Sequence, residues 1–263
     1  MSNDPLLEAV LKTGVTLPTP SIAFARLQAL SVSERAGPRE MAEVVGKDPA
    51  LTGSLMRVAN SPVFGCRSQP RSVQDAITLL GRTRTLAVCI STALRSQAEG
   101  VDARTLEAVW SGSQKVAEGA WRCAQASPAR RLADQAYLAA LLHEVGIPIL
   151  LKRHPMYLFL FKDPKLTLEE ASRKLDDLTQ ADHAALGGMV ARNWKLPGDV
   201  SEAIRCHHDP AAAARLPEEA GTLATLIAFG RLLRDGPSED WLPWAPLADR
   251  YLKLDPGGLG NRQ

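Results

Sequence analysis

The stretch Val44-Val-Gly-Lys-Asp-Pro-Ala-Leu-Thr-Gly-Ser-Leu-Met-Arg-Val-Ala-Asn-Ser61 carries the clearest helix signals of this 263-residue chain. Asp48-Pro49 combines a side chain that caps a helix N-terminus with a proline at the first helical position. Over residues 50–60 the apolar residues recur at helical spacing. The stretch therefore predicts a helix that begins after Asp48 and buries one face.

Helix signals of this kind recur on both sides of the stretch, whereas alternating β-branched runs with hairpin turns are almost absent. Pro38 and Gly46 bound one expected helix, and Thr167-Leu-Glu-Glu170 is a capping box that starts another. Further helices are expected over residues 72–81, 102–125, 132–144, 181–194, 200–207 and 218–233. The sequence predicts an all-α fold of about a dozen helices, in which 102–125 packs against 132–144.

Breaks in the helical pattern suggest four segments. The best internal boundary lies near residues 96–102, where Ser-Gln-Ala-Glu-Gly interrupts the helices. We expect an N-terminal extension over 1–14, an N-terminal helical subdomain over 15–100 and a second helical subdomain over 101–235. The tail, 236–263, is rich in proline and tryptophan, and we expect it to wrap onto the body before a disordered end at 257–263.

Composition narrows the classes of function. The 31 Lys and Arg against 29 Asp and Glu leave a charge of +2, too small to indicate binding to nucleic acid or to an anionic membrane. The N-terminus lacks the basic flank and apolar run of a signal peptide, and no apolar stretch reaches the length that crosses a bilayer. The four cysteines form no CxxC pair. We expect a cytoplasmic protein with buried, reduced thiols and no contact with a membrane.

Several motifs resemble those of the HD-related output domain (HDOD) family. In the N-terminal half, Asp48, Pro49, Asn60 and Ser61 match the family pattern in order, after Leu17-Pro-Thr-Pro20. The C-terminal half adds the segments Leu141-Leu-His-Glu-Val-Gly146, Asp182-His-Ala-Ala-Leu-Gly187, Trp194-Lys-Leu-Pro197 and Ala203-Ile-Arg-Cys-His-His-Asp-Pro210. The resemblance covers roughly residues 15–235 and implies a multi-helix, HD-like bundle with an N-terminal helical subdomain. We interpret the four matching residues as a helix cap and a helix stop.

The family is named after the HD phosphohydrolases, which hold a divalent metal with a histidine, a His-Asp pair and a distant aspartate. By that resemblance Gly112 or Ser113 stands at the place of the first histidine, and His143-Glu144 at the place of the pair. Residues 223–230, where the last aspartate is expected, contain no acid. The metal set is therefore depleted.

Five residues remain as candidates for a vestigial cleft or ligand site: His143, Glu144, His183, His207 and His208. Each histidine also has a structural interpretation, since a helix C-terminus favours His143, His207 and His208, and Asp182 caps the helix that starts at His183. We predict no catalytic residue and no cofactor. If a metal binds, the expected ligands are His143, Glu144, His183 and His207, a set that suits a softer ion such as zinc.

The resemblance, together with the depleted metal set, implies a non-catalytic bacterial signal-transduction module. The resemblance implies that it regulates by binding a protein partner, such as a response regulator, a kinase or a cyclic-dinucleotide enzyme, or by binding a small signalling ligand. The alternative is a metal-dependent phosphohydrolase that acts on a nucleotide or cyclic dinucleotide. A regulator that binds nucleic acid is less favoured, because the chain shows no basic recognition helix.

Overall fold

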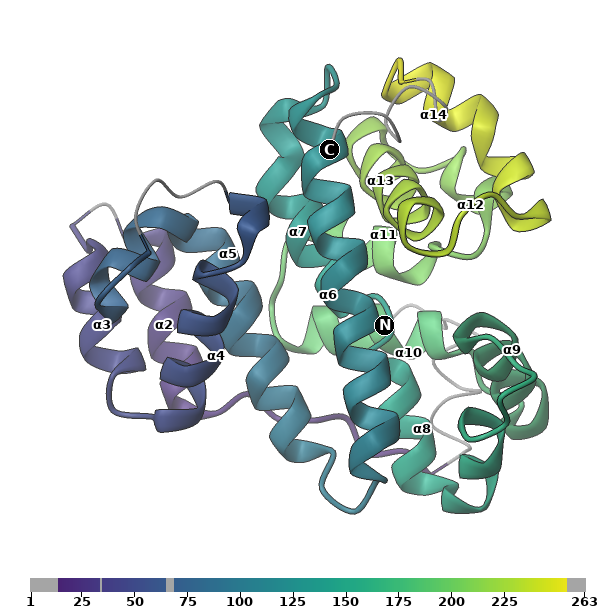
Figure 1. Ribbon diagram of the computed structural model, residues 1–263, viewed down its shortest axis with the longest axis horizontal. Coiled ribbons are helices and arrows are strands. Elements are labelled where there is room, and N and C mark those ends of the chain that lie inside the picture. Colours follow the sequence, from purple (N-terminus) through teal and green to yellow (C-terminus); the bar gives the residue numbers. More distant parts are fainter. Residues whose placement is uncertain (1–13, 34, 65–68, 255–263) are drawn as a thin grey trace, which may run out of the picture. The chain divides into compact units, whose positions relative to one another are not determined.

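The computed structural model describes residues 14–33, 35–64 and 69–254. Within these ranges the chain forms thirteen α-helices, four short 3-10 helices and no strand, which confirms the predicted all-α class (Figure 1). The predicted disordered end at 257–263 and Cys66 lie outside the described residues. The other three cysteines are buried free thiols. None of the described helices is long and apolar enough to span a membrane.

The fold divides into two units. The small unit is Thr19–Gln97, and the large unit combines Met1–Pro18 with Ala98–Gln263. The described residues before the small unit are joined to the large unit by hydrogen bonds, because the Trp194 indole Nε1 donates to the Pro18 carbonyl oxygen at 2.8 Å and Asn193 Nδ2 donates to the same oxygen at 3.2 Å. The chain therefore leaves the large unit, builds the small one and returns.

The small unit consists of four helices: α2 (Ile22–Val32), α3 (Pro38–Val45), α4 (Pro49–Ala59) and α5 (Val73–Gln97). Asp48 caps α4 as predicted, since its carboxylate accepts hydrogen bonds from the backbone N–H groups of Ala50 at 2.8 Å and Leu51 at 3.1 Å. Asn60 is the C-cap, and its Nδ2 donates to the Met56 carbonyl at 2.8 Å. The motif residues thus fix the two ends of one helix.

Two features of α5 go beyond the sequence pattern. The break predicted at Gly81 is present, with φ 73° and ψ 175°, but helical residues resume after it and continue to Gln97. Glycine permits this backbone conformation, which a side chain would strain. Arg82, which its charge alone would leave solvated, donates through its guanidinium to the carbonyl oxygens of Ser31, Ser33 and Ala36 at and beyond the end of α2. Carbonyls at a helix end have no helical partner, so Arg82 satisfies them.

The large unit is built around α6 (Ala103–Gln125), α7 (Ala133–Leu142) and α13 (Glu218–Asp235), which pack on one another (Figure 1). The predicted packing of α6 against α7 is confirmed. Gly230 allows the close approach of α13 to α6, because a Cβ there would lie 2.4 Å from the Val116 carbonyl oxygen. The remaining α-helices are α8 (Gly146–Arg153), α9 (Leu168–Thr179), α10 (His183–Asn193), α11 (Gly198–Arg205), α12 (Pro210–Ala213) and α14 (Ala245–Tyr251).

The four 3-10 helices are η1 (Pro62–Phe64), η2 (Arg130–Leu132), η3 (Pro155–Phe161) and η4 (Glu239–Trp244). The last of these belongs to the tryptophan-rich tail, which packs on α13 with the Trp241 ring against Phe229 at a centroid distance of 5.1 Å. The tail therefore adds to the core of the large unit over its described part.

Candidate functional site

Four of the five histidines of the chain gather in the interior of the large unit. His143 caps the C-terminus of α7, and Glu144 follows it. His183 is the first residue of α10, behind the N-cap Asp182. His207 and His208 come just after α11 ends. All five predicted residues meet in one group, which we call the histidine cluster, whereas His154 lies apart at the end of α8.

His143 and His207 are held in the same way. Each donates its Nδ1 hydrogen to the carbonyl oxygen three residues earlier, Ala140 and Ile204 respectively, at 2.6 Å. This arrangement leaves each Nε2 facing the cluster, buried and without a hydrogen-bond partner among the described residues. The rings meet edge to face, with centroids 5.0 Å apart. The helix-end placement expected for both histidines therefore also points a basic nitrogen inward.

His183 connects two carboxylates. Its Nδ1 lies 2.6 Å from Asp176 Oδ2, its backbone N–H donates to Asp176 Oδ1 at 3.0 Å, and its Nε2 lies 3.1 Å from Glu144 Oε2. Burial alone would lower the pKa of His183, but the contacts with Asp176 and Glu144 outweigh it and raise the pKa to about 10. His183 is therefore a buried cation at neutral pH, flanked by two acids.

Glu144 is the buried acid of the cluster. Burial raises its pKa, yet the contacts with His143 and His183 outweigh burial and hold the pKa well below the usual range. His143 Nε2 lies 3.4 Å from Glu144 Oε1. Neither carboxylate oxygen has a hydrogen-bond partner of good geometry among the described residues. Glu144 is thus a buried anion with acceptor capacity to spare.

His208 forms the outer edge of the cluster. Its Nε2 lies 3.0 Å from His183 Nε2, and its Nδ1 lies 3.0 Å from Glu169 Oε1 and 3.1 Å from Arg231 Nη1. Burial lowers the pKa of His208, and the charge of Arg231 lowers it further. Arg231 also pairs with Glu169 through Nη2. An ion pair from α9 and α13 therefore covers the one partly exposed member of the cluster.

The backbone supports this geometry at Gly146. A Cβ on Gly146 would lie 2.1 Å from the His183 carbonyl oxygen, so only glycine allows the turn after His143-Glu144 to approach the start of α10. Sequence reasoning placed the histidines but missed Asp176, Glu169 and Arg231. Asp176 is seven residues before His183 and is joined to it across a turn, a pairing that helical spacing does not predict.

Four of these side chains could hold a metal. One ligand atom each from Glu144, His183, His207 and His208 lies within 4.8 Å of the others. Three imidazoles and one carboxylate, with unpartnered atoms on Glu144 and His207, fit a single ion of borderline softness such as zinc, which would have to displace the Nε2 proton of His183. The sequence predicted His143 as the fourth ligand, whereas in the structure His208 completes the set.

The structure also places the two positions at which the resemblance predicts that the metal set is depleted. Gly112 lies on α6, and a Cβ there would meet Arg234 Nη1 at 3.3 Å. Residues 223–230 of α13 contribute no acid, and the next residue is Arg231, which contacts His208. Guanidinium groups thus lie near both positions where the resemblance led us to look for a histidine and an acid.

Comparisons with known proteins agree with this fold. A family profile described as the HDOD domain matches residues 17–210. A solved structure from Shewanella amazonensis, provisionally named a metal-dependent phosphohydrolase, is similar with a TM-score of 0.69 and 21% identity over 98% of this chain and 91% of that one. A Geobacter sulfurreducens HDOD domain protein with unknown function is similar with a TM-score of 0.68 and 21% identity over 98% of this chain and 89% of that one.

One curated relative is a longer protein. An uncharacterized protein from Treponema pallidum is 24% identical over 199 residues, which are 73% of this chain and 37% of the relative. The chain therefore spans less than half of that relative's length. At these identities the solved structures establish the fold.

Proposed function

Because the chain belongs to the HDOD family, we propose that it is a signal-transduction module that regulates by binding and performs no catalysis. The observation that carries the proposal is the closure of the histidine cluster. His143, Glu144, His183 and His207 are at most 1% exposed. Metal-assisted hydrolysis needs a coordination position that water and substrate can reach.

The ion pair beside His208 supports the same conclusion. The His208 side chain is 19% exposed, and the Arg231 guanidinium and the Glu169 carboxylate both contact its Nδ1. A guanidinium at this distance repels a divalent cation, and the carboxylate that offsets it is already paired with Arg231. Any reacting phosphate would have to displace this pair first.

The expected partner is a protein of a signalling pathway: a response regulator, a kinase or a cyclic-dinucleotide enzyme. The charge of +2 supports a protein or a small ligand over nucleic acid. We place the module in the cytoplasm, where such partners act.

A metal-dependent phosphohydrolase is the second candidate. The observation that favours it is the group of Glu144, His183, His207 and His208, whose ligand atoms converge within 4.8 Å. One zinc-like ion held there would act as a Lewis acid toward a phosphoester. The two candidate functions differ in one measurable property: only the phosphohydrolase would use the histidine cluster to hydrolyse a phosphodiester.

The test combines metal content with turnover. The purified protein is supplied with zinc, manganese or iron, its bound metal is measured by mass spectrometry, and hydrolysis of bis(p-nitrophenyl) phosphate is followed. We expect the wild-type protein to hydrolyse this substrate no faster than variants that lack the cluster. A His143→Ala/His183→Ala double variant removes the cluster, and His154→Ala is the control because His154 lies outside it. Turnover that persists in the control and disappears in the double variant would overturn the proposal, whereas bound metal without turnover would leave a structural ion.

A further inference from the structure

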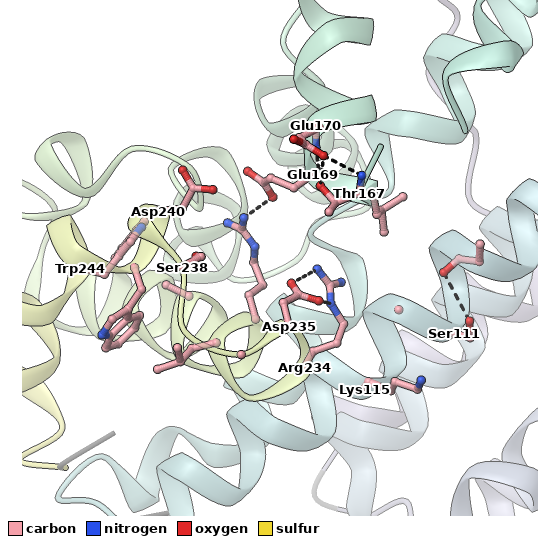
Figure 2. Close-up of a pocket in the computed structure, with 18 residues that line it drawn as sticks. Ser111, Lys115, Thr167, Glu169, Glu170, Arg234, Asp235, Ser238, Asp240 and Trp244 are labelled. Carbon is pink, nitrogen blue, oxygen red and sulfur yellow. Dashed lines mark hydrogen bonds and ion pairs between the residues drawn. The ribbon is translucent and has the colours of Figure 1, made fainter. Parts of the chain in front are cut away.

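The arginines that line the cavity of the large unit are paired with its acids (Figure 2). This cavity measures about 690 Å³ and is walled by α6, α9, α13 and η4. Arg231 pairs with Glu169, and Arg234 pairs with Asp235, so these arginines offer no free charge to a ligand. An unpartnered surface lies instead on the small unit, along the outer face of α2.

The helix α2 is apolar on both of its faces. The inner face buries Phe24 and Leu27, and α2 packs on α3 and α5. The outer face carries four exposed apolar residues, which we call the α2 stripe: Ile22, Ala25, Ala29 and Val32. Their spacing of three, four and three residues places them within an arc of about 80°. A surface helix normally turns charged residues outward, so an uncharged outer face indicates a surface that a partner covers.

The exposure of the stripe is unusual for this chain. Ile22 is 91% exposed and Val32 is 79% exposed, and these are the two most exposed large hydrophobic side chains of the described residues. Single exposed apolar residues are common on protein surfaces, but here two of them share one helix face with two exposed alanines between them. The four residues therefore form one continuous apolar surface.

The shape of the stripe suits a second helix. The two alanines lie in its middle and the larger residues at its ends. Small side chains allow the axis of a packed helix to approach to about 8 Å. Ile22 and Val32 would then contact that helix on either side of the closest approach. A spacing that alternates three and four residues is also the spacing of the seam between two packed helices.

The charge around the stripe is positive. Thr19–Gln97 holds ten Lys and Arg against five Asp and Glu, whereas the rest of the chain holds 21 against 24. Arg26 borders the stripe, since it is one turn from Ile22, and Arg35 follows the end of α2. Both arginines are exposed and take part in no ion pair of the described residues. A partner whose charge complements this unit is therefore acidic.

We propose that the outer face of α2 binds an acidic amphipathic helix of a partner protein, with the partner's apolar residues along the α2 stripe and its acids beside Arg26 and Arg35. The inference rests on the proposed function, because it names the surface and the kind of partner through which the module binds. Nucleic acid fits less well, since the stripe itself carries no cation for phosphates. A lipid surface also fits less well, because helices that lie in membranes bury a broader face of Leu, Phe and Trp.

The test uses the full chain and a fluorescein-labelled synthetic helix of heptad repeats, with isoleucine and leucine on one face and glutamate on the others. The same peptide with lysine in place of glutamate is the comparison. Fluorescence anisotropy should show saturable binding of the glutamate peptide, with an affinity about tenfold or more above that of the lysine peptide. Arg26→Glu should weaken binding of the glutamate peptide and strengthen binding of the lysine peptide.

Two matched variants separate the stripe from the overall charge. Ala29→Glu places a charge in the middle of the stripe and should lower the affinity for the glutamate peptide about tenfold or more. Ala108→Glu adds the same charge at an exposed position of α6, in the large unit, and should bind like the wild type. Both alanines are exposed, so neither change should lower the temperature of thermal unfolding.

Several outcomes would overturn the inference. These are equal affinity for the two peptides, the absence of saturable binding, and binding that Ala29→Glu leaves unchanged. A lower unfolding temperature of Ala29→Glu would mean that the chain's own residues cover the stripe. A dimer in analytical ultracentrifugation that Ala29→Glu dissociates would assign the stripe to a second copy of the chain, and sedimentation with phosphatidylglycerol vesicles that this variant abolishes would assign it to lipid. Hydrolysis of bis(p-nitrophenyl) phosphate by the cluster would instead contradict the proposed function and leave this binding surface in place.

Discussion

The small unit uses its polar motif residues only to bond to the backbone, whereas the large unit also bonds some of them side chain to side chain. In the small unit Asp48 and Asn60 bond to the backbone at the two ends of α4, and Arg82 satisfies carbonyls beyond the end of α2. In the large unit His183 bonds side chain to side chain, with Asp176 and Glu144, in a buried interior. A motif that is easy to find in the sequence can therefore serve only to hold helices, and the candidate chemistry lies where buried polar side chains bond to one another.

The energetic consequences of the two arrangements differ. An exposed cap exchanges water for a backbone hydrogen bond at small net gain. A buried charge is stable only while its partners stay in place, because removing one of them leaves an uncompensated charge away from water. All five histidines of the sequence also lie in the large unit, and none lies within Thr19–Gln97. Stability measurements can test this contrast directly.

The largest effect is expected for His183→Ala. The change leaves the buried Glu144 and the partly exposed Asp176 without their cation, and breaking a buried pair such as that with Glu144 costs about 3–5 kcal/mol. The free energy of unfolding, measured by urea titration in the presence of a chelator, should fall by that amount. His154→Ala, outside the cluster, should cost less than about 1 kcal/mol. A similar small loss for both variants would show that the buried network contributes no more than a surface histidine does.

The next effect is a stability maximum near pH 6.5, the ordinary pKa of histidine. The pKa of His183 is raised to about 10, so its contribution is complete below 6.5 and is lost as the pH rises through 10. The pKa values of His207 and His208 are lowered well below 6.5, so their contribution is complete above 6.5 and is lost as the pH falls. Each proton taken up or released changes the free energy of unfolding by about 1.4 kcal/mol per pH unit.

Urea titrations over the range from about pH 5 to about pH 9 check this maximum. Hydrogen exchange sharpens the comparison, because acid should reduce the protection of α10 and α11 before that of α4 in the small unit. His208→Gln removes one of the acid-sensitive groups and should make the acid limb shallower. A profile without a maximum, or an acid limb unchanged in this variant, would contradict the assignment.

Local signals in the sequence predicted most helix ends. The caps Asp48 and Asp182 and the capping box at Thr167 and Glu170 depend on contacts within three residues, which a sequence displays directly. The break at Gly81 was predicted, but not the helical residues after it, because a single glycine marks a turn without determining the conformation of the next residues. The all-α fold class could be predicted from the sequence because it too depends on such local signals.

Only some residues of the candidate site could be predicted from the sequence. His143, His183, His207 and His208 stand at helix ends that the sequence marks, so their convergence could be expected from the resemblance. Their partners could not, since Glu169 and Arg231 are 62 residues apart and meet only through the packing of α9 and α13. No periodicity of either helix predicts which charged side chain turns inward.

A smaller effect is expected for the two aspartate caps, one in each unit. Asp48 accepts from two backbone N–H groups at 2.8 and 3.1 Å, and Asp182 does so at 2.7 and 3.1 Å. Because the local geometry is the same, Asp48→Ala and Asp182→Ala should each cost about 1 kcal/mol of unfolding free energy. Asp182 is adjacent to His183, so the comparison separates the cap from the cluster. A loss at Asp182 well above that at Asp48 would show that this cap also supports the buried network.

The smallest effect, and one of opposite sign, is expected for Gly53→Ala in α4. A Cβ at Gly53 would meet nothing within 4 Å, and the position is an exposed one inside a regular helix. Alanine restricts the unfolded chain and has the higher helix propensity, so urea titration should show a gain of about 0.5–1 kcal/mol. A loss would instead reveal a contact on this face of the small unit. Gly53→Ser, which adds a similar volume with a lower helix propensity, is the control that separates crowding from propensity. If both variants lose stability, crowding is the cause. The side of α4 that carries Gly53 would then be in contact with other groups and not with solvent.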